Sequence, residues 1–377
     1  MLLKKSYKFR LKPRRKHETL CVQFAGARRW IINRGLHQRK TAWEQEKRRI
    51  TLFDQNNELA VLKEQEETAW LKEVHSQVLQ QGLQDLESAH QHFFRRVQKG
   101  EKPGYPRFKR RGESDSFRYP QGVKVKDDLV WLPKIGWVRF KKTREIEGII
   151  KQTTILCKAG KWYVSFSCEV ECEMTQVEPQ DVLGIDLGLE SFATTVSLNS
   201  ESIVPNPRFL KRDLTYLRIV SKQLSRKVLR SNNRRKFKAK LTAFHAKVKN
   251  RRKDFLHKLS TLLVKSHDAI AVESLNVKSL LGNTIKSMAR SISDAGWRQF
   301  LQMLKYKCEA NGKKFFEIDQ FFPSTKLCSS CGAKKQLSLS ERIYKCECGL
   351  ELHRDINAAR NIRAAGMAVL KACGAAP

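Results

Sequence analysis

Apolar residues in the first part of the chain follow two different periods. Residues 7–11 alternate apolar and charged side chains before Pro13, which is typical of a strand. Residues 19–98 lack proline and repeat Leu, Val and Trp at helical spacing, which predicts a bundle of three or four helices. Residues 117–170 return to short alternating runs between turns, which predicts an antiparallel β-sheet or small β-barrel. If the strand at 7–11 joins this sheet, the helices are an insertion into it.

The pattern changes to mixed α/β from residue 182 onward. Residues 182–186 and 269–273 are short apolar runs that each end in an acidic residue, as buried strands of an α/β sheet can. Further strands are predicted at 192–198 and 314–318, and helices at 210–265, at 297–310 and from 354 onward. The polar stretch 171–181 is expected to link the two halves.

The charge of the chain is strongly one-sided. Lys and Arg number 74 against 38 Asp and Glu, which gives a formal net charge of +36. Such a surface repels itself unless a polyanion neutralises it, and nucleic acid is the expected partner. A ribosomal-type or merely solubilising surface is the alternative. The sequence shows neither a signal peptide nor a run of 18 apolar residues, so we expect no membrane partner and a cytoplasmic, nucleoid-associated location of prokaryotic type.

Two segments concentrate this charge. Residues 222–258 hold 15 Lys or Arg and one acidic residue, with apolar residues spaced between them. A helix with this pattern can pack on a core and leave a basic face for an RNA or heteroduplex backbone, although a solvated helical face is the alternative. Residues 107–111 (RFKRR) mix an aromatic ring with charge and could serve the same purpose.

Four of the ten cysteines lie close together in the sequence, in two pairs. Cys328 and Cys331 form a C-x-x-C pair, and Cys346 and Cys348 form a C-x-C pair, each followed by glycine. Four thiolates at this spacing predict a closed tetrahedral site for structural Zn²⁺. Disulfides and unrelated core cysteines are the alternatives. Disulfides conflict with the reducing compartment that we expect, and four cysteines within 21 residues, in two pairs, are hard to obtain by accident.

Three acidic residues stand out from their surroundings. Asp186 and Glu273 end the two apolar runs, and Asp355 lies just past the cysteines, where a helix is predicted to begin. If the two strands are parallel neighbours, their acids emerge side by side, and the last helix can bring the third acid to them. Three converging carboxylates can hold two Mg²⁺ ions for phosphodiester hydrolysis. Ordinary caps or ion pairs are the alternative.

The segment G-I-D-L-G at 184–188 also suggests a different function, because it is similar to the first phosphate hairpin of actin-like ATPases. An ATPase would need a second glycine-rich phosphate hairpin, which the sequence does not show. It would also leave the cysteine pairs and the charge unexplained, so the nuclease hypothesis is preferred.

Motifs along nearly the whole chain resemble those of TnpB, the OrfB-type protein of insertion sequences and a relative of the type V CRISPR effectors. They are Y-K-F-R-L-K-P (7–13), G-A-R-R (26–29) with Asn33, Y-P-R-F-K-R-R (105–111), G-I-D-L-G-L-E (184–190), N-P-R-F-L (206–210), V-E-S-L-N (272–276), the four cysteines and H-R-D-I-N-A-A-R-N-I (353–362). The C-x-C pair departs from the commoner C-x-x-C of the family but still supplies two thiolates.

The resemblance implies a multidomain α+β protein. It implies a wedge β-barrel in two parts at 1–18 and 100–175, a helical recognition domain at 19–99 inserted into it, a RuvC/RNase H-like nuclease core at 182–326, an inserted zinc ribbon at 327–352, and the final helix of the core at 353–377.

The resemblance also implies an activity and its partners. Asp186, Glu273 and Asp355 would be the catalytic triad of an RNA-guided DNA endonuclease that binds a guide RNA from the end of its transposable element. Such an enzyme cuts matching double-stranded DNA beside a short adjacent motif, with base pairing reading the sequence. An accessory nucleic-acid-binding protein of transposition without cleavage activity is the alternative.

Overall fold

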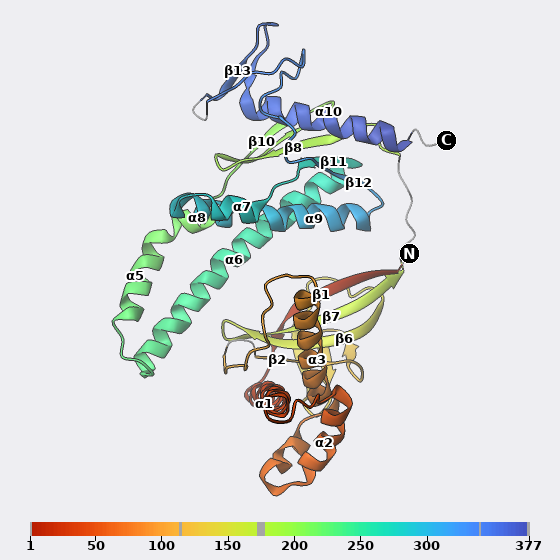
Figure 1. Cartoon of the computed structure of the whole chain (residues 1–377), viewed down its shortest axis with the longest axis vertical. Coiled ribbons are helices and arrows are strands. Elements are labelled where there is room, and N and C mark those ends of the chain that lie inside the picture. The colour runs from red at the N-terminus through yellow and green to blue at the C-terminus, as the bar shows by residue number, and fades with distance from the viewer. Residues whose placement is uncertain (1, 113–114, 172–177, 339–340, 375–377) are drawn as a thin grey trace. The chain divides into compact units, whose positions relative to one another are not determined.

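The computed structural model describes residues 2–112, 115–171, 178–338 and 341–374 (Figure 1). The chain divides into two compact units, residues 1–172 and 173–377, each with its own hydrophobic core. Most of the linker predicted at 171–181 lies outside the described residues.

The first unit is built on an antiparallel sheet in the order β2-β6-β7-β1-β5-β4-β3. Its strands are β1 (Leu2–Lys12), β2 (Ser116–Tyr119), β3 (Lys124–Lys126), β4 (Leu129–Leu132), β5 (Gly136–Lys141), β6 (Ile149–Lys158) and β7 (Lys161–Glu171). Strand β1 lies between β7 and β5, so the prediction that the first strand joins the later sheet is confirmed. Among the described residues, β2 and β3 are the edge strands of this sheet and do not pair with each other. The structure therefore supports an antiparallel sheet, and a closed barrel stays a prediction.

The helices of the first unit form the insertion that the sequence predicted. They are α1 (Arg15–Glu46), α2 (Leu52–Glu64), the 3₁₀ helix η1 (Glu66–Glu73) and α3 (Ser76–Gln98). Helix α2 begins with a capping box, because the Thr51 hydroxyl accepts a hydrogen bond from Asp54 N and the Asp54 carboxylate accepts one from Thr51 N. Helix α3 packs on α1 with one apolar face, which includes Leu79 and Leu83.

The second unit contains a five-stranded sheet in the order β10-β9-β8-β11-β12. The strands are β8 (Leu183–Leu187), β9 (Ser191–Val196), β10 (Glu201–Pro205), β11 (Ala269–Glu273) and β12 (Lys314–Ile318). Strand β11 runs parallel to both β8 and β12, whereas β9 and β10 are antiparallel. Residues 182–186 and 269–273 were predicted as strands, and the structure shows that these strands are parallel neighbours, which is the condition under which their acids emerge side by side.

Helices cover both faces of this sheet (Figure 1). One face packs on α6 (Asn232–Ser266) and α9 (Trp297–Ala310), and the other packs on α10 (Arg354–Gly374). Alternate residues of β8 and β11 enter the two cores, which explains why their sequences are apolar throughout rather than alternating. The remaining elements are α4 (Phe209–Arg212), α5 (Leu214–Ser225), α7 (Val277–Gly282), α8 (Lys286–Ala295) and the two-stranded ribbon of β13 (Ile343–Lys345) and β14 (Glu351–His353).

Candidate active site and cysteine cluster

Two of the predicted acidic residues lie side by side at the ends of parallel strands. The register of β8 and β11 pairs Gly184 with Ala271, so Asp186 and Glu273 stand together two residues further along. Residues two apart in a strand share a face. Asp186 therefore points to the same side of the sheet as Gly184, and Glu273 points to the same side as Ala271.

Helix α10 lies on this face because two glycines let its backbone approach the strands. A Cβ atom on Gly184 would lie 2.2 Å from the carbonyl oxygen of Ala359, and one on Gly366 would lie 2.6 Å from the Cβ of Ala271. Asp355 precedes Ala359 by one helical turn and so shares its side of the helix. The close packing thus delivers Asp355, in the first turn of α10, to the carboxylates of the strands.

The electrostatics of the site confirm that the three predicted acids are close neighbours. The carboxyl group of Asp186 is surrounded by protein, and this burial, followed by the negative charges of Asp355 and Glu273, raises its pKa to about 7. Burial also raises the pKa of Glu273, although a hydrogen bond from the Ser324 hydroxyl (3.5 Å) acts in the opposite direction. Arg354 is the nearby cation, with its Nε 3.8 Å from Asp355 Oδ1.

This donor set fits divalent metal ions. Three carboxylates with one nearby cation leave an excess of negative charge in a partly buried site, and their hard oxygen atoms are ligands that Mg²⁺ prefers. Among the described residues these carboxylates do not form a group whose oxygens all lie within 4.8 Å of one another.

The four cysteines come together as predicted. Their Sγ atoms all lie within 4.8 Å of one another, and both Cys328–Cys348 and Cys331–Cys346 are separated by 3.6 Å. A tetrahedral zinc site with Zn–S bonds of about 2.3 Å requires S–S edges of about 3.8 Å, so the cluster has the size for Zn²⁺. Burial raises the pKa of Cys328, but hydrogen bonds from backbone N–H groups outweigh this and lower it to about 6, which favours the thiolate.

The turns that hold the cysteines depend on glycine. Gly332 and Gly349 have φ of 74° and 90°, and each donates its N–H to the carbonyl of the first cysteine of its pair. Only glycine adopts this conformation without strain, which is the physical basis of the Gly after each pair.

Two buried asparagines, which the sequence analysis did not single out, connect the cysteine cluster to the acidic site. Asn357 donates to the Leu327 carbonyl (2.6 Å) and accepts from Ser329 N (2.9 Å). Asn361 donates to the carbonyls of Ser324 and Leu327, both at 2.8 Å. We call these residues the asparagine clasp, because they fasten the loop before the first cysteine pair to α10. The sequence feature that could have identified them is a pair of asparagines four residues apart on a predicted helix face that is otherwise apolar.

The clasped loop also reaches the acidic site directly. Ser324, whose carbonyl accepts from Asn361, donates its hydroxyl to Glu273. A single loop therefore contacts the end of β11, the helix that carries Asp355 and the first cysteine pair. The cysteine cluster is positioned to support the acidic site mechanically.

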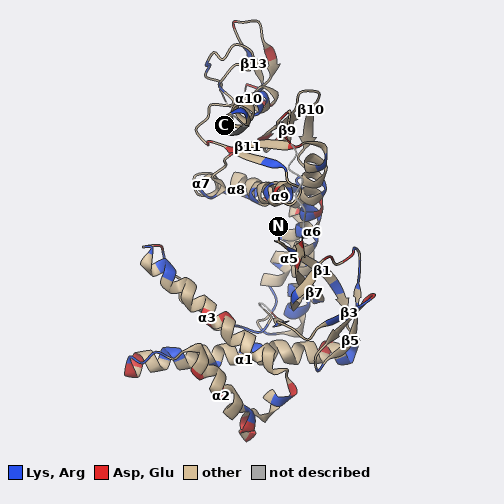
Figure 2. Ribbon diagram, turned by 90° about the vertical axis from the view of Figure 1, so that its right-hand side faces the viewer, with Lys and Arg blue, Asp and Glu red and all other residues tan. Residues whose placement is uncertain are grey.

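The basic tract 222–258 spans the end of α5, the turn after it and most of α6 (Figure 2). Tyr216 and Phe244 pack with their ring centroids 4.6 Å apart and hold the two helices together. Arg234 donates to the carbonyls of Leu224 and Lys227 and closes the turn. Most Lys and Arg side chains of the tract are left exposed, as the sequence predicted.

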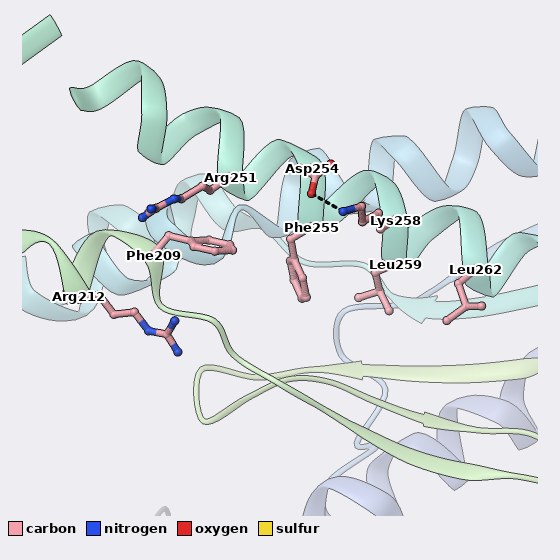
Figure 3. Close-up of a pocket in the computed structure, with 8 residues that line it drawn as sticks. All are labelled: Phe209, Arg212, Arg251, Asp254, Phe255, Lys258, Leu259 and Leu262. Carbon is pink, nitrogen blue, oxygen red and sulfur yellow. Dashed lines mark ion pairs between the residues drawn. The ribbon is translucent and has the colours of Figure 1, made fainter. Parts of the chain in front are cut away.

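A groove of about 830 Å³ lies between α4 and α6 (Figure 3). Phe209, Phe255 and Leu259 line it, with Arg212 and Arg251 toward one end. The acidic residue of its lining, Asp254, is paired with Lys258 at 2.8 Å. The groove contains none of the three predicted acids, so it is separate from the candidate active site.

Profiles of known families match three parts of the chain. OrfB_IS605, described as "Probable transposase", matches residues 165–284, and the Cas12f1-like TNB domain matches residues 297–362, which include all four cysteines and Asp355. A profile described as a helix-turn-helix domain matches residues 1–48, where the structure has β1 and the single long helix α1.

Similar proteins align with the chain over almost its full length. "Putative RNA-guided DNA endonuclease InsQ" of Escherichia coli (strain K12) is 36% identical, over 98% of this chain and 94% of its own. A "Putative RNA-guided DNA endonuclease" of Streptomyces pristinaespiralis is also 36% identical, over 99% of this chain and 91% of its own. The chain belongs to the OrfB_IS605 family of TnpB-like proteins, as its motifs predicted.

Solved structures share its fold. The protein in the cryo-EM structure of a Cas12f1–sgRNA–target DNA complex has a TM-score of 0.59 at 12% identity, over 96% of this chain and 99% of its own. The mini RNA-guided endonuclease CRISPR-Cas_phi3 has a TM-score of 0.53 at 11% identity, over 96% of this chain and 92% of its own. The mixed α/β fold of this chain is thus similar to the folds of these two proteins. Within the part of the chain that the structure describes, every helix is too short or too polar to cross a membrane.

Proposed function

We propose that this protein is an RNA-guided DNA endonuclease of a transposable element, which cuts guide-matched DNA beside a short adjacent motif. Asp186, Glu273 and Asp355 are its catalytic residues and hold two Mg²⁺ ions. The convergence of these three acids at one edge of the sheet is the observation that carries the proposal.

The acids prepare the site for a bound phosphodiester. Burial and mutual repulsion oppose full ionisation of the three carboxylates together, so their charges favour cation binding over an empty site. When bound, the two ions supply an activated water and stabilise the leaving 3′-oxygen. The close contact of α10 with β8 fixes the distance from Asp355 to Asp186 and Glu273. The protein therefore sets the spacing of the three metal-binding carboxylates through its own packing.

Guide RNA and double-stranded target DNA are the proposed partners. Proteins 36% identical to this chain are named as RNA-guided DNA endonucleases, and a structure of the same fold contains sgRNA and target DNA. The exposed basic tract on α5 and α6 offers this chain a surface for a phosphate backbone.

The domain assignment is part of the same proposal. The second unit would be the RuvC/RNase H-like core, with the ribbon at 327–352 holding structural Zn²⁺ through Cys328, Cys331, Cys346 and Cys348. The first unit would be the wedge domain with its inserted helical recognition domain. The division between the two units, at residues 172 and 173, falls within the predicted linker.

The substitution Asp186→Asn tests the catalytic assignment. Full-length protein purified with its RNA should lose cleavage of guide-matched DNA in Mg²⁺ while its RNA and target binding stay within about twofold of wild type. Glu317→Gln is the matched control, because Glu317 is an exposed acid on β12 of the same sheet. Undiminished cleavage by the Asp186 variant would reject the assignment. Absence of cleavage by the wild type, despite specific RNA binding, would favour the accessory protein without nuclease activity.

A further inference from the structure

The first unit contains a cavity that the proposed nuclease chemistry does not use. It has a volume of about 480 Å³ and lies where α1 faces η1 and the residues that follow it. Trp30 and Trp70 line it, with ring centroids 5.6 Å apart and ring planes at 77°. Trp70 is 41% exposed, so this lining residue is partly open to solvent.

Polar groups accompany these rings. The side chains of Gln23, Arg29 and Glu73 also line the cavity. Arg29 is already paired with Asp115 at 2.7 Å, so Gln23 and Glu73 are the main polar groups that can hydrogen-bond a ligand beside the aromatic rings. A cavity that only fills a gap in a hydrophobic core would be lined by apolar groups. This combination suits a flat heterocycle with polar edges, which stacks on an indole and uses its edge atoms for hydrogen bonds.

A basic segment is fastened at the same cavity. Asn33, another lining residue, donates to the Lys109 carbonyl (3.0 Å) and accepts from Lys109 N (2.7 Å). The segment 105–111 (YPRFKRR), which we call the basic strap, is thereby held beside the two tryptophans. Arg107, Arg110 and Arg111 of the strap are exposed, and Phe108 is 51% exposed.

We propose that the cavity lined by Trp30 and Trp70 binds one unpaired nucleobase, stacked on one of these rings, of a nucleic-acid strand whose phosphates lie on the basic strap. Stacking on aromatic rings and contact of the backbone with cations are the two interactions by which proteins hold single strands. This site is separate from the acidic site of the second unit. The inference rests on the proposed nucleic-acid binding but not on catalysis.

The substitution Trp70→Ala tests the site in the full-length protein without Mg²⁺. The probes are a decamer of riboadenylate, a decamer of deoxyadenylate and an abasic decamer of the same charge. We expect the variant to bind a base-bearing decamer about 5- to 150-fold more weakly than wild type, because one stacked base is lost. Binding of the abasic decamer should stay unchanged, because the phosphate contacts remain. The base-bearing decamer with the larger loss, RNA or DNA, identifies the kind of strand that the cavity takes.

Two further variants control the measurement. Trp43→Ala removes a tryptophan that is 57% exposed on α1, the helix of Trp30, but lies outside the cavity, and should leave all affinities unchanged. Trp70→Phe keeps an aromatic ring and should restore at least half of the lost binding energy. Unchanged binding of both base-bearing decamers by Trp70→Ala would overturn the proposal, as would an equal loss for the abasic decamer. This test measures binding and not DNA cleavage. A negative result would therefore reject the base-binding cavity without affecting the proposed catalytic role of Asp186.

Discussion

Gly184→Ala is the most informative single change, because it adds one methyl group where α10 meets β8. The new Cβ would lie 2.2 Å from the Ala359 carbonyl oxygen, 2.6 Å from Arg363 N and 2.8 Å from Arg363 Cβ. Two of these atoms belong to the helix backbone, so they cannot rotate away. The oxygen contact must lengthen to at least 3.0 Å, which moves the helix by about 0.8 Å.

This movement should affect stability and activity to different degrees. Overpacking of a core costs about 1–3 kcal/mol, which for a unit of this size corresponds to a decrease in Tm of about 2–12 °C. The same movement carries Asp355 away from Asp186 and Glu273. A displacement near 1 Å in a catalytic site can cost about 100-fold in rate, so we expect cleavage to fall by one to two orders of magnitude.

The assay compares single-turnover DNA cleavage at saturating Mg²⁺ with thermal unfolding and RNA binding. Gly282→Ala is the matched control: Gly282 ends α7, and a Cβ there would meet nothing within 4 Å. The control should cleave normally and unfold at or slightly above the wild-type temperature. Wild-type cleavage by Gly184→Ala, with unchanged Tm, would refute the argument that the approach of α10 sets the site.

Three further predictions follow from the pKa of Asp186, the cysteine cluster and the asparagine clasp. Because the pKa of Asp186 is raised from near 4 to about 7 in the folded protein, the metal-free protein should lose stability as pH rises through that interval, and its affinity for Mg²⁺ should rise over the same interval. Denaturant unfolding in EDTA across this pH range measures the effect, and an identical slope for Asp186→Asn would contradict it. Cys346→Ser should retain less than half an equivalent of zinc by metal analysis and lose both stability and cleavage, and full cleavage by the zinc-free variant would separate the cluster from the active site. Asn361→Leu removes the donor to the Ser324 carbonyl and one of the two donors to the Leu327 carbonyl, which keeps its hydrogen bond from Asn357. The variant should therefore destabilise the protein by roughly 1–3 kcal/mol, because the Ser324 carbonyl is left unpaired. The exposed Asn283→Leu serves as its control, and equal unfolding curves for the two variants would refute the role of the clasp.

Much of the second unit could be predicted from local patterns. The helix at 297–310 and the strand at 314–318 have the bounds that the sequence indicated. Both predictions rely on the alternation of apolar and polar side chains between core and solvent, and this alternation can be read directly from the sequence. Strand β10 and helices α7 and α8 were not predicted. β10 is an exposed edge strand, and α7 contains no buried residue, so burial leaves little pattern in either sequence.

The sequence by itself determined which residues are the candidates for the chemistry: an acid at the end of each of two apolar runs, a third at the start of the last helix, and four cysteines in glycine-ended pairs. Their meeting was decided by contacts far apart along the chain. The parallel register placed Glu273 beside Asp186, the space above Gly184 admitted α10, and the asparagine clasp joined the cysteine loop to that helix. The spacing of apolar residues along the sequence indicates that a residue is buried, but it does not indicate which distant segment covers that residue. For this reason the raised pKa of Asp186, which depends first on its burial and then on the charges of Asp355 and Glu273, became visible only in the tertiary structure.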